Sequence, residues 1–230
     1  MNPVLKRVLT GLTIGAAVVA ALLLAPAKAL EAVLLVLWAL LFVEYEALLR
    51  RKLSYASAPL QGFGLLGAGL ACISLMVVSL VAILARHGNL VLLYVLAIVK
   101  FSDVGGFAFG LSSAKLMKGG NHKMCPTISP NKSWEGLFGS VFCSCLVSCA
   151  FKGVTGFGWG DSVFLGVVAA LFGTAGDLVE SKFKRWVGVK DSSTMKITNG
   201  MGGFLDMFDS LLFAPAAICC ILDLAGTASC

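Results

Sequence analysis

Four acidic residues stand in two pairs of equal spacing, each at the edge of a long apolar stretch. Asp177 and Glu180 end one stretch, and Asp206 and Asp209 begin the next within GMGGFLDMFDS. Residues three apart project from one face of a helix, so each pair can present two carboxylates together. A carboxylate beside hydrocarbon is costly unless a cation, a basic side chain or a water-filled cavity accompanies it. The two pairs therefore predict a site for positive charge between them.

A basic loop joins the two pairs. Its sequence, SKFKRWVGVKDSSTMK, combines Lys184, Arg185 and Lys190 with hydroxyl groups, a mixture that suits phosphate oxygens. Magnesium held by one or two carboxylates together with substrate phosphates matches this arrangement. Two other interpretations stay open: the aspartates only pair with these basic side chains, or the loop docks on anionic lipid head groups. For Glu180, a structural role is an equal alternative to metal ligation.

A third candidate is formed by Lys100 and Asp103, which are also three apart and lie within an apolar stretch. The alternatives here are an internal ion pair and a functional site. Gly105, Gly106 and Gly110 follow directly, and glycines at such places let a backbone or a ligand approach closely.

The elements that must position these residues are those of a membrane protein. The 230 residues are 58% hydrophobic and 13% charged, against roughly 25% charged residues in soluble domains. Strand-like alternation is absent, which predicts an all-α polytopic membrane protein. The first apolar run follows basic residues but lacks a convincing cleavage site, so we expect a retained helix. The apolar runs predict about seven transmembrane helices, at 8–26, 30–49, 60–85, 89–110, 136–151, 161–179 and 204–225.

The basic residues predict the orientation of these helices. Of the 18 Lys and Arg residues, alternate loops hold 14, the intervening loops hold three, and one lies within a span. This positive-inside asymmetry places the N-terminus and loops 50–59, 111–135 and 180–203 in the cytoplasm and the C-terminus outside. We expect N-terminal transmembrane helices over 1–85 and a catalytic transmembrane region over 86–230 that uses the two long loops.

Several motifs in the second half resemble those of the phosphatidate cytidylyltransferases, the CDP-diacylglycerol synthases. SKFKRWVGVKD…GMGGFLDMFDS is similar to the family signature, GDLVES precedes it, and DVGGFAFG…GNHKMCPTISPNKSWEG is similar to a region further upstream. The resemblance covers about residues 90–215, with the motifs in order. Met201 stands where the family has His, Met207 stands where it has Arg, and the segment before the glycine turn is two residues longer. The chain is also shorter than the family pattern by about two spans.

The resemblance implies that a phosphatidate oxygen attacks the α-phosphorus of CTP, which yields CDP-diacylglycerol and pyrophosphate with Mg²⁺ as cofactor. The implied metal ligands are Asp177 and Asp206, with Asp209 binding directly or through water. Asp177 and Asp206 also belong to the implied catalytic set, together with Lys184, Arg185 and Lys190. The implied substrate-binding residues are Asp103, His122, Lys123, Ser129, Lys132, Ser181, Asp191, Gly202 and Gly203.

The expected partners are cytosolic CTP and phosphatidic acid in the bilayer, without nucleic acid, and a homodimer stays open. The expected location is a bacterial-type inner membrane with the site facing the cytoplasm, where lipid phosphate and soluble nucleotide can meet. One alternative is a transporter of an anionic solute centred on Lys100 and Asp103, although no internal repeat supports it. The others are a catalytically silent lipid-binding homologue and a CTP-dependent enzyme acting on another lipid phosphate.

Overall fold

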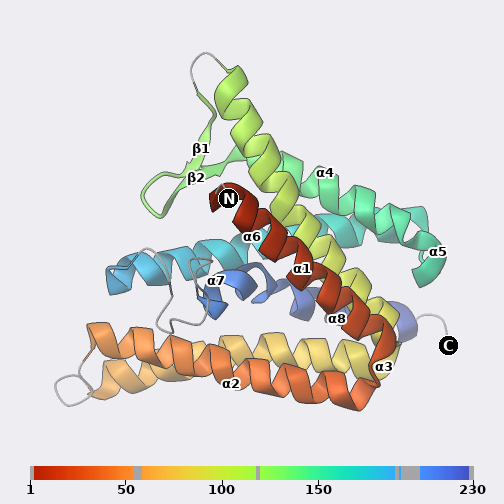
Figure 1. Cartoon of the computed structure of the whole chain (residues 1–230), viewed down its shortest axis with the longest axis horizontal. Helices are drawn as coiled ribbons and strands as arrows, with labels where there is room; N and C mark the ends of the chain where they lie inside the picture. The colour runs from red at the N-terminus through yellow and green to blue at the C-terminus, as the bar shows by residue number, and fades with distance from the viewer. Residues whose placement is uncertain (1–2, 54–58, 118–119, 190–191, 193–202, 228–230) are drawn as a thin grey trace.

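The computed structural model describes residues 3–53, 59–117, 120–189, 192 and 203–227. All described elements are helical except one short hairpin of two antiparallel strands (Figure 1). The helical class is therefore confirmed, and the hairpin is an addition that the hydropathy pattern did not predict. The elements in chain order are α1 (Pro3–Leu24), α2 (Ala27–Lys52), α3 (Pro59–Leu116), β1 (Lys123–Cys125), β2 (Ser129–Ser133), α4 (Trp134–Ala150), α5 (Lys152–Thr155), α6 (Trp159–Val187), α7 (Phe204–Phe208), the 3-10 helix η2 (Asp209–Leu211) and α8 (Ala214–Thr227).

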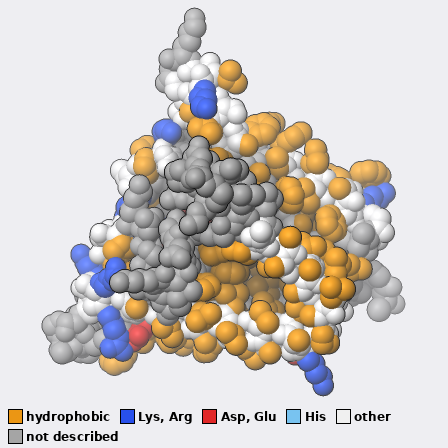
Figure 2. Space-filling model, viewed as in Figure 1, with side chains coloured by type: hydrophobic (Ala, Val, Ile, Leu, Met, Phe, Trp, Pro, Cys, Tyr) orange, Lys and Arg blue, Asp and Glu red, His pale blue; other side chains and the backbone are white. Residues whose placement is uncertain are grey.

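Several of these helices suit a membrane. Four helical segments of the described chain are long and apolar enough to cross one, by length and composition: Ala27–Lys52, Gly62–Leu116, Trp159–Val187 and Phe204–Leu224. Thr13–Leu24 and Trp134–Ala150 are shorter apolar helices. Hydrophobic side chains cover much of the visible surface in Figure 2, whereas most visible Lys and Arg side chains lie along its left edge and top. Apolar helix surfaces of this kind are what lipid contact requires.

Helix α3 consists of two arms that meet at Gly88. This residue has φ 83° and ψ 179°, a backbone conformation that glycine adopts at little cost. The 55 residues of Gly62–Leu116 would form a straight helix of about 80 Å, more than twice the roughly 30 Å of a bilayer core. Figure 1 shows the first arm beside α2 and the second arm leaving it at a steep angle. The predicted stretches 60–85 and 89–110 fall on these two arms.

Small residues bring the second arm of α3 against α4. A Cβ atom added at Gly105 would lie 2.4 Å from the carbonyl oxygen of Gly139, and one at Gly106 would lie 2.4 Å from Ser140 Oγ. Such small side chains let two helices approach closely in a lipid environment, where packing drives association. The glycines that follow Asp103 therefore serve the approach of another helix.

Hydroxyl groups connect α4 to α6, the helix that carries Asp177 and Glu180. Ser144 Oγ donates to the carbonyl oxygen of Gly166 at 2.8 Å, and Ser148 Oγ donates to that of Ser162 at 2.6 Å. Interhelical hydrogen bonds of this kind hold transmembrane helices together. Figure 1 shows the hairpin, α7 and the C-terminal end of α6 in the left half of the molecule, whereas α5, α8 and the bend of α3 lie to the right.

Candidate active site

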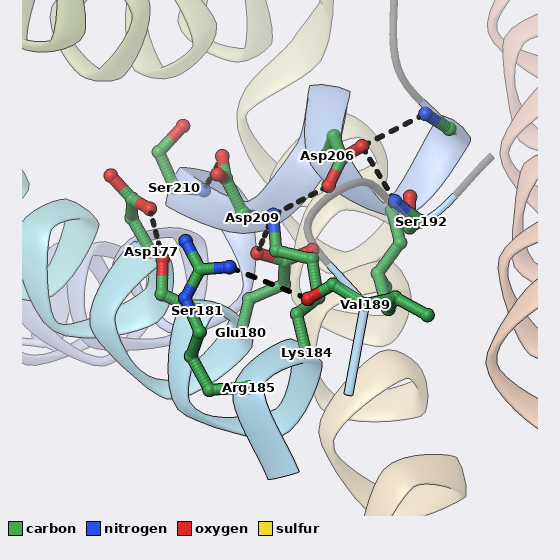
Figure 3. Close-up of polar contacts among 12 residues, drawn as sticks. Asp177, Glu180, Ser181, Lys184, Arg185, Val189, Ser192, Asp206, Asp209 and Ser210 are labelled. Carbon is green, nitrogen blue, oxygen red and sulfur yellow. Dashed lines mark hydrogen bonds and ion pairs between the residues drawn. The ribbon is translucent and has the colours of Figure 1, made fainter. Parts of the chain in front are cut away.

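Three carboxylates converge where α6 meets η2. One oxygen each from Asp177, Glu180 and Asp209 lies within 4.8 Å of the others, and Figure 3 shows their side chains on these two adjoining segments. Glu180 is buried, and its Oε1 atom has no hydrogen-bond partner in the part of the chain that the structure describes. Magnesium and calcium take oxygen ligands of this kind. The cluster, and its unsatisfied buried acceptor, thus fit a hard divalent cation.

Gly176 allows η2 to lie this close to α6. A Cβ atom at this position would stand 2.4 Å from the carbonyl oxygen of Asp209, and one at Gly173 would stand 3.5 Å from that of Ser210. A side chain at 176 would therefore push η2 away. Since Asp177 is the next residue of α6, the glycine sets the separation between Asp177 and Asp209.

Asp206 lies outside the three-carboxylate cluster. Its Oδ1 atom accepts a hydrogen bond from Lys184 Nζ at 2.6 Å, and its Oδ2 atom accepts from the amides of Gly203 at 2.9 Å and Ser192 at 3.0 Å (Figure 3). Asp206 is the third residue of α7 and satisfies the amide of Gly203 at the start of that helix. In this structure Asp206 therefore fits the interpretation in which an aspartate pairs with a basic side chain, and its predicted metal ligation stays a prediction.

Two lysines bring ammonium groups into the acidic region. Lys184 Nζ lies 2.6 Å from Glu180 Oε2 as well as 2.6 Å from Asp206 Oδ1. Lys132 reaches over from β2, and its Nζ atom lies 2.5 Å from Asp177 Oδ2. Lysine is a compact charge on a flexible stem, so both side chains are suited to bind phosphate near the cluster.

The second arm of α3 joins the site through Lys100 and Asp103. Lys100 Nζ donates to the carbonyl oxygen of Met207 at 2.8 Å and to Ser210 Oγ at 3.0 Å. It also lies 3.5 Å from Asp103 Oδ2, to which Ser210 Oγ donates at 2.7 Å. The internal ion pair is thus present, and it also connects α3 to the segment that carries Asp209.

The hairpin is fixed to the start of α4 by His122 and Glu135. His122 Nδ1 lies 2.7 Å from Glu135 Oε1, and the His122 amide donates to both carboxylate oxygens. The hydrogen bond with the His122 side chain lowers the pKa of Glu135 to about 2. The His122 side chain is 75% exposed. These contacts hold the hairpin in the position from which Lys132 reaches Asp177.

A cavity of 1080 Å³ connects the acidic region with apolar helix surfaces. One part of it is polar and is lined by Lys100, Asp103, Ser129, Lys132, Asp177, Asp206 and Asp209. The other part is apolar and is lined by residues of α1 and the second arm of α3, among them Val18, Val19, Leu93, Leu96, Phe101 and Phe107. The cavity therefore suits a molecule with a charged head and a hydrocarbon tail.

The remaining predicted residues lie around this core. Ser181 Oγ donates to Asp177 Oδ1 at 3.3 Å. Arg185 donates to the carbonyl oxygens of Ile128 and Val189, at 3.4 and 3.5 Å, which connects α6 to the hairpin turn. Lys123 lies exposed on β1. Three predicted site residues lie outside the described part of the chain: Lys190, Asp191 and Gly202.

One buried carboxylate beside the site, Glu44 of α2, is absent from the predicted set. It is 1% exposed, and its Oε2 atom accepts a hydrogen bond from the Leu205 amide at 2.8 Å. An acidic residue inside the apolar sequence LLFVEYEALL is a signal of a special role. Glu46 gives the same signal but forms an ion pair with Arg50 on the helix surface, so the pattern alone does not separate the two.

Comparison with known proteins identifies the family of this chain. A model described as the cytidylyltransferase family matches residues 5–225, nearly the whole chain. The chain belongs to the cytidylyltransferase family. The resemblance stated from the motifs is thereby confirmed.

Similar members of the cytidylyltransferase family come from bacteria. The phosphatidate cytidylyltransferase of Staphylococcus aureus (strain COL) is 47% identical over 124 residues, which are 53% of this chain and 45% of that protein. Those of Staphylococcus epidermidis (strain ATCC 12228) and Staphylococcus haemolyticus (strain JCSC1435) are 44% and 42% identical over the same shares. The matched part of the chain thus spans about half the length of the curated relatives it matches.

Proposed function

We propose that this protein is a CTP:phosphatidate cytidylyltransferase that produces CDP-diacylglycerol and pyrophosphate. The observation that carries the proposal is the amphiphilic cavity, because Asp177 and Asp209 of the carboxylate cluster line it together with apolar helix residues. A phospholipid with a phosphate head fits such a cavity with its head at the polar part and its acyl chains along α1 and α3. The names of the relatives support the same substrates.

The reaction needs no covalent intermediate on the protein. A phosphate oxygen of phosphatidate forms a bond to the α-phosphorus of CTP, and the bond from that phosphorus to the bridging oxygen of the β-phosphate breaks. Pyrophosphate leaves with the bonding electron pair. Positioning and charge neutralisation supply most of the catalysis in such a transfer.

Mg²⁺ is the proposed cofactor, with Asp177, Glu180 and Asp209 as the side chains that would hold it. When bound, the ion neutralises phosphate charge and favours departure of pyrophosphate. Asp206 stays in the proposed catalytic set as the carboxylate that holds Lys184 and begins α7. Mutation of Asp206 and of Asp209 in separate variants tests which of the two binds the metal directly.

The basic residues have proposed roles at the phosphates. Lys132 pairs with Asp177 and Lys184 with Glu180, so both lysines lie at the carboxylate cluster and would bind the triphosphate. Lys100, which lines the polar part of the cavity, would bind the lipid phosphate. Arg185 and Lys190 are retained from the motif as further phosphate contacts. Ser129, Ser181, Gly203, Asp103, His122, Lys123, Asp191 and Gly202 complete the proposed substrate-binding set.

We also propose seven spans with a cytoplasmic N-terminus. They are α1, α2, the two arms of α3, α4 from residue 136 onward, α6 and the segment from α7 to α8. The hairpin, α7 and the C-terminal end of α6 lie on one side of Figure 1, and α5, α8 and the α3 bend on the other, as this alternation requires. The division into 1–85 and 86–230, and the inner-membrane location, belong to the same proposal.

The test is an assay of the purified protein in detergent with labelled CTP, phosphatidate and Mg²⁺, in which CDP-lipid and pyrophosphate are both measured. We expect equal amounts of the two products and no turnover after chelation of the metal. A Staphylococcus phosphatidate cytidylyltransferase in the same micelles serves as the positive control. CTP turnover with only a different lipid phosphate would reject phosphatidate as substrate, and binding without turnover would favour the silent homologue.

A further inference from the structure

Glu44 places a buried carboxylate from α2 against the start of α7, far in sequence from every motif of the second half. Its Oε2 atom accepts from the Leu205 amide at 2.8 Å. Its Oε1 atom lies so close to Gly203 that a Cβ atom there would stand 2.1 Å from it. Burying a carboxylate is costly, so this residue has a role that an apolar side chain does not fill.

The segment that Glu44 contacts needs external support. Helix α7 has five residues, too few to be stable alone, and the amides of its first turn have no partners within the helix. Asp206 Oδ2 accepts from the Gly203 amide, and Glu44 accepts from the Leu205 amide. The two carboxylates together thus hold the beginning of α7.

Asp209 follows α7 directly, as the first residue of η2. The α7–η2 segment is therefore held from two sides: Glu44 of α2 fixes its start, and the contact with Gly176 of α6 fixes the backbone at Asp209. A shift of α7 would move the Asp209 carboxylate relative to Asp177, because the two elements are continuous.

The position of Glu44 is itself well determined. The adjacent Tyr45 donates its hydroxyl to the carbonyl oxygen of Leu65 at 2.7 Å, and its ring stacks on Phe183 with centroids 4.8 Å apart. These contacts fix this turn of α2 against both α3 and α6. A rigid element of this kind can hold a neighbouring carboxylate within the tolerance that a bound cation demands.

We infer that Glu44 is a positioning residue for the carboxylate cluster, which extends the candidate site to an N-terminal helix outside the family motifs. The inference rests on the proposed function in one respect, since it takes the cluster to bind a divalent cation. Glu44 acts through α7, because it belongs neither to the cavity lining nor to the three-carboxylate cluster.

The experiment compares Glu44→Leu, Glu44→Gln and the matched control Glu46→Gln in the full-length protein in detergent. Glu46 lies two residues away on the same helix and pairs with Arg50 at the surface. Hydrogen exchange of the segment 203–213 is measured beside that of α4, and Mn²⁺ affinity is measured by electron paramagnetic resonance. The exchange readout follows the segment directly, whereas Mn²⁺ affinity follows the cluster.

For Glu44→Leu we expect exchange of 203–213 to rise and Mn²⁺ affinity to fall, each by about tenfold, because a hydrogen bond to a charged group is lost. Glu44→Gln keeps a neutral acceptor and should change both by about threefold, because charge-assisted hydrogen bonds are roughly twice as strong. Exchange in α4 should stay unchanged, and Glu46→Gln should behave as the unmodified protein.

Equal hydrogen exchange of 203–213 in Glu44→Gln and Glu46→Gln would overturn the inference. An increase of exchange in α4 as large as that in 203–213 in Glu44→Gln would overturn it as well. If Glu44→Leu does not fold, the two glutamine variants decide. If the unmodified protein binds no Mn²⁺, the proposed cation site fails, and the exchange comparison still decides whether Glu44 holds α7.

Discussion

Charge is arranged in opposite ways at the two ends of the helices. At the end that holds the α3 bend, Asp223 of α8 forms an ion pair with Arg86 and lies 3.7 Å from His87, so one carboxylate meets two basic side chains. At the other end, four of the carboxylates, Asp103, Asp177, Glu180 and Asp206, share the ammonium groups of three lysines. Asp209 lies beside them, and no ion pair of Asp209 is found among the described residues.

This difference separates a structural cluster from a site that can accept a ligand. A single carboxylate that faces two basic side chains gains little from an additional cation. Converging carboxylates with too few partners repel one another, and a divalent ion relieves that repulsion. The balance of charge therefore distinguishes the two ends, although both combine aspartate with basic residues.

The strongest test of the difference between the two ends replaces one aspartate with asparagine at each end, Asp209 at the site and Asp223 at the α3 bend. Asp209→Asn should reduce CDP-lipid formation by about 100-fold or more, because a charge that the transition state needs is removed. Mn²⁺ binding should be lost as well, since one of three ligands becomes neutral. Steady-state assays and electron paramagnetic resonance check the two effects.

Asp223→Asn is the matched control at the opposite end. It should leave turnover within about twofold of the unmodified protein, because exposed ion pairs contribute little. A similar loss of activity in both variants would remove the distinction between the ends.

Asp206→Asn sharpens the comparison within the site. Asparagine keeps one oxygen that accepts from an amide but loses the charge that holds Lys184. We expect turnover to fall by about tenfold, the effect of one charged hydrogen bond, while Mn²⁺ affinity stays nearly unchanged. If Asp206→Asn abolishes Mn²⁺ binding as completely as Asp209→Asn, then Asp206 is a metal ligand as the motif implies.

The contrast between Asp206 and Asp209 also shows what sequence spacing can predict. The spacing correctly indicates two carboxylates beside the basic loop, and hydropathy identifies the apolar helices and both arms of α3. It does not show that Asp206 begins a five-residue helix, because that depends on Gly203, Ser192 and Lys184 meeting in space. The spacing of residues in the sequence therefore identifies the candidate residues but does not show which of them binds a cation and which supports a helix.

Glu44 marks a second limit of prediction from sequence. Its contact with Leu205 spans 161 residues, and no periodicity within α2 refers to a partner so distant. The hairpin is a third example, since β1 and β2 have three and five residues and form within a polar loop without an apolar strand pattern. The role of Glu44 arises from a tertiary contact, whereas the hairpin depends on strand pairing and on the contact between His122 and Glu135, which hydropathy does not report.

Gly176→Ala tests whether the site end depends on the close approach of η2. A methyl group here would meet the Asp209 carbonyl oxygen at 2.4 Å, so η2 must shift. Overpacking of this kind costs about 1–3 kcal/mol, and we expect Mn²⁺ affinity to fall by about tenfold. Isothermal titration or electron paramagnetic resonance measures the change.

Gly160→Ala is the control on the same helix, because a Cβ atom there meets nothing within 4 Å. It should leave Mn²⁺ affinity unchanged and stabilise α6 slightly, since alanine favours the helix. Equal Mn²⁺ affinities for the two alanine variants would show that cation binding does not depend on the close approach of η2 to α6.

The smallest expected effect concerns Glu135 and His122, a balanced pair that lies at the site end. The pKa of Glu135 is lowered to about 2 from its ordinary value of 4.5, chiefly by the hydrogen bond with His122. A lowered pKa in the folded protein means that ionised Glu135 stabilises the fold fully above pH 4.5. This contribution is lost as the pH falls from there toward 2.

Thermal unfolding of the unmodified protein and Glu135→Gln in detergent at pH 5 and pH 3 measures that contribution. The difference in Tm should be larger at pH 5 than at pH 3, and it should shrink in 1 M salt because exposed charges are screened over about 3 Å there. CDP-lipid formation at neutral pH should change little, since the pair lies outside the carboxylate cluster. A loss comparable to that of Asp209→Asn would show that a balanced pair at this end also serves catalysis, and charge balance would then no longer separate structure from function.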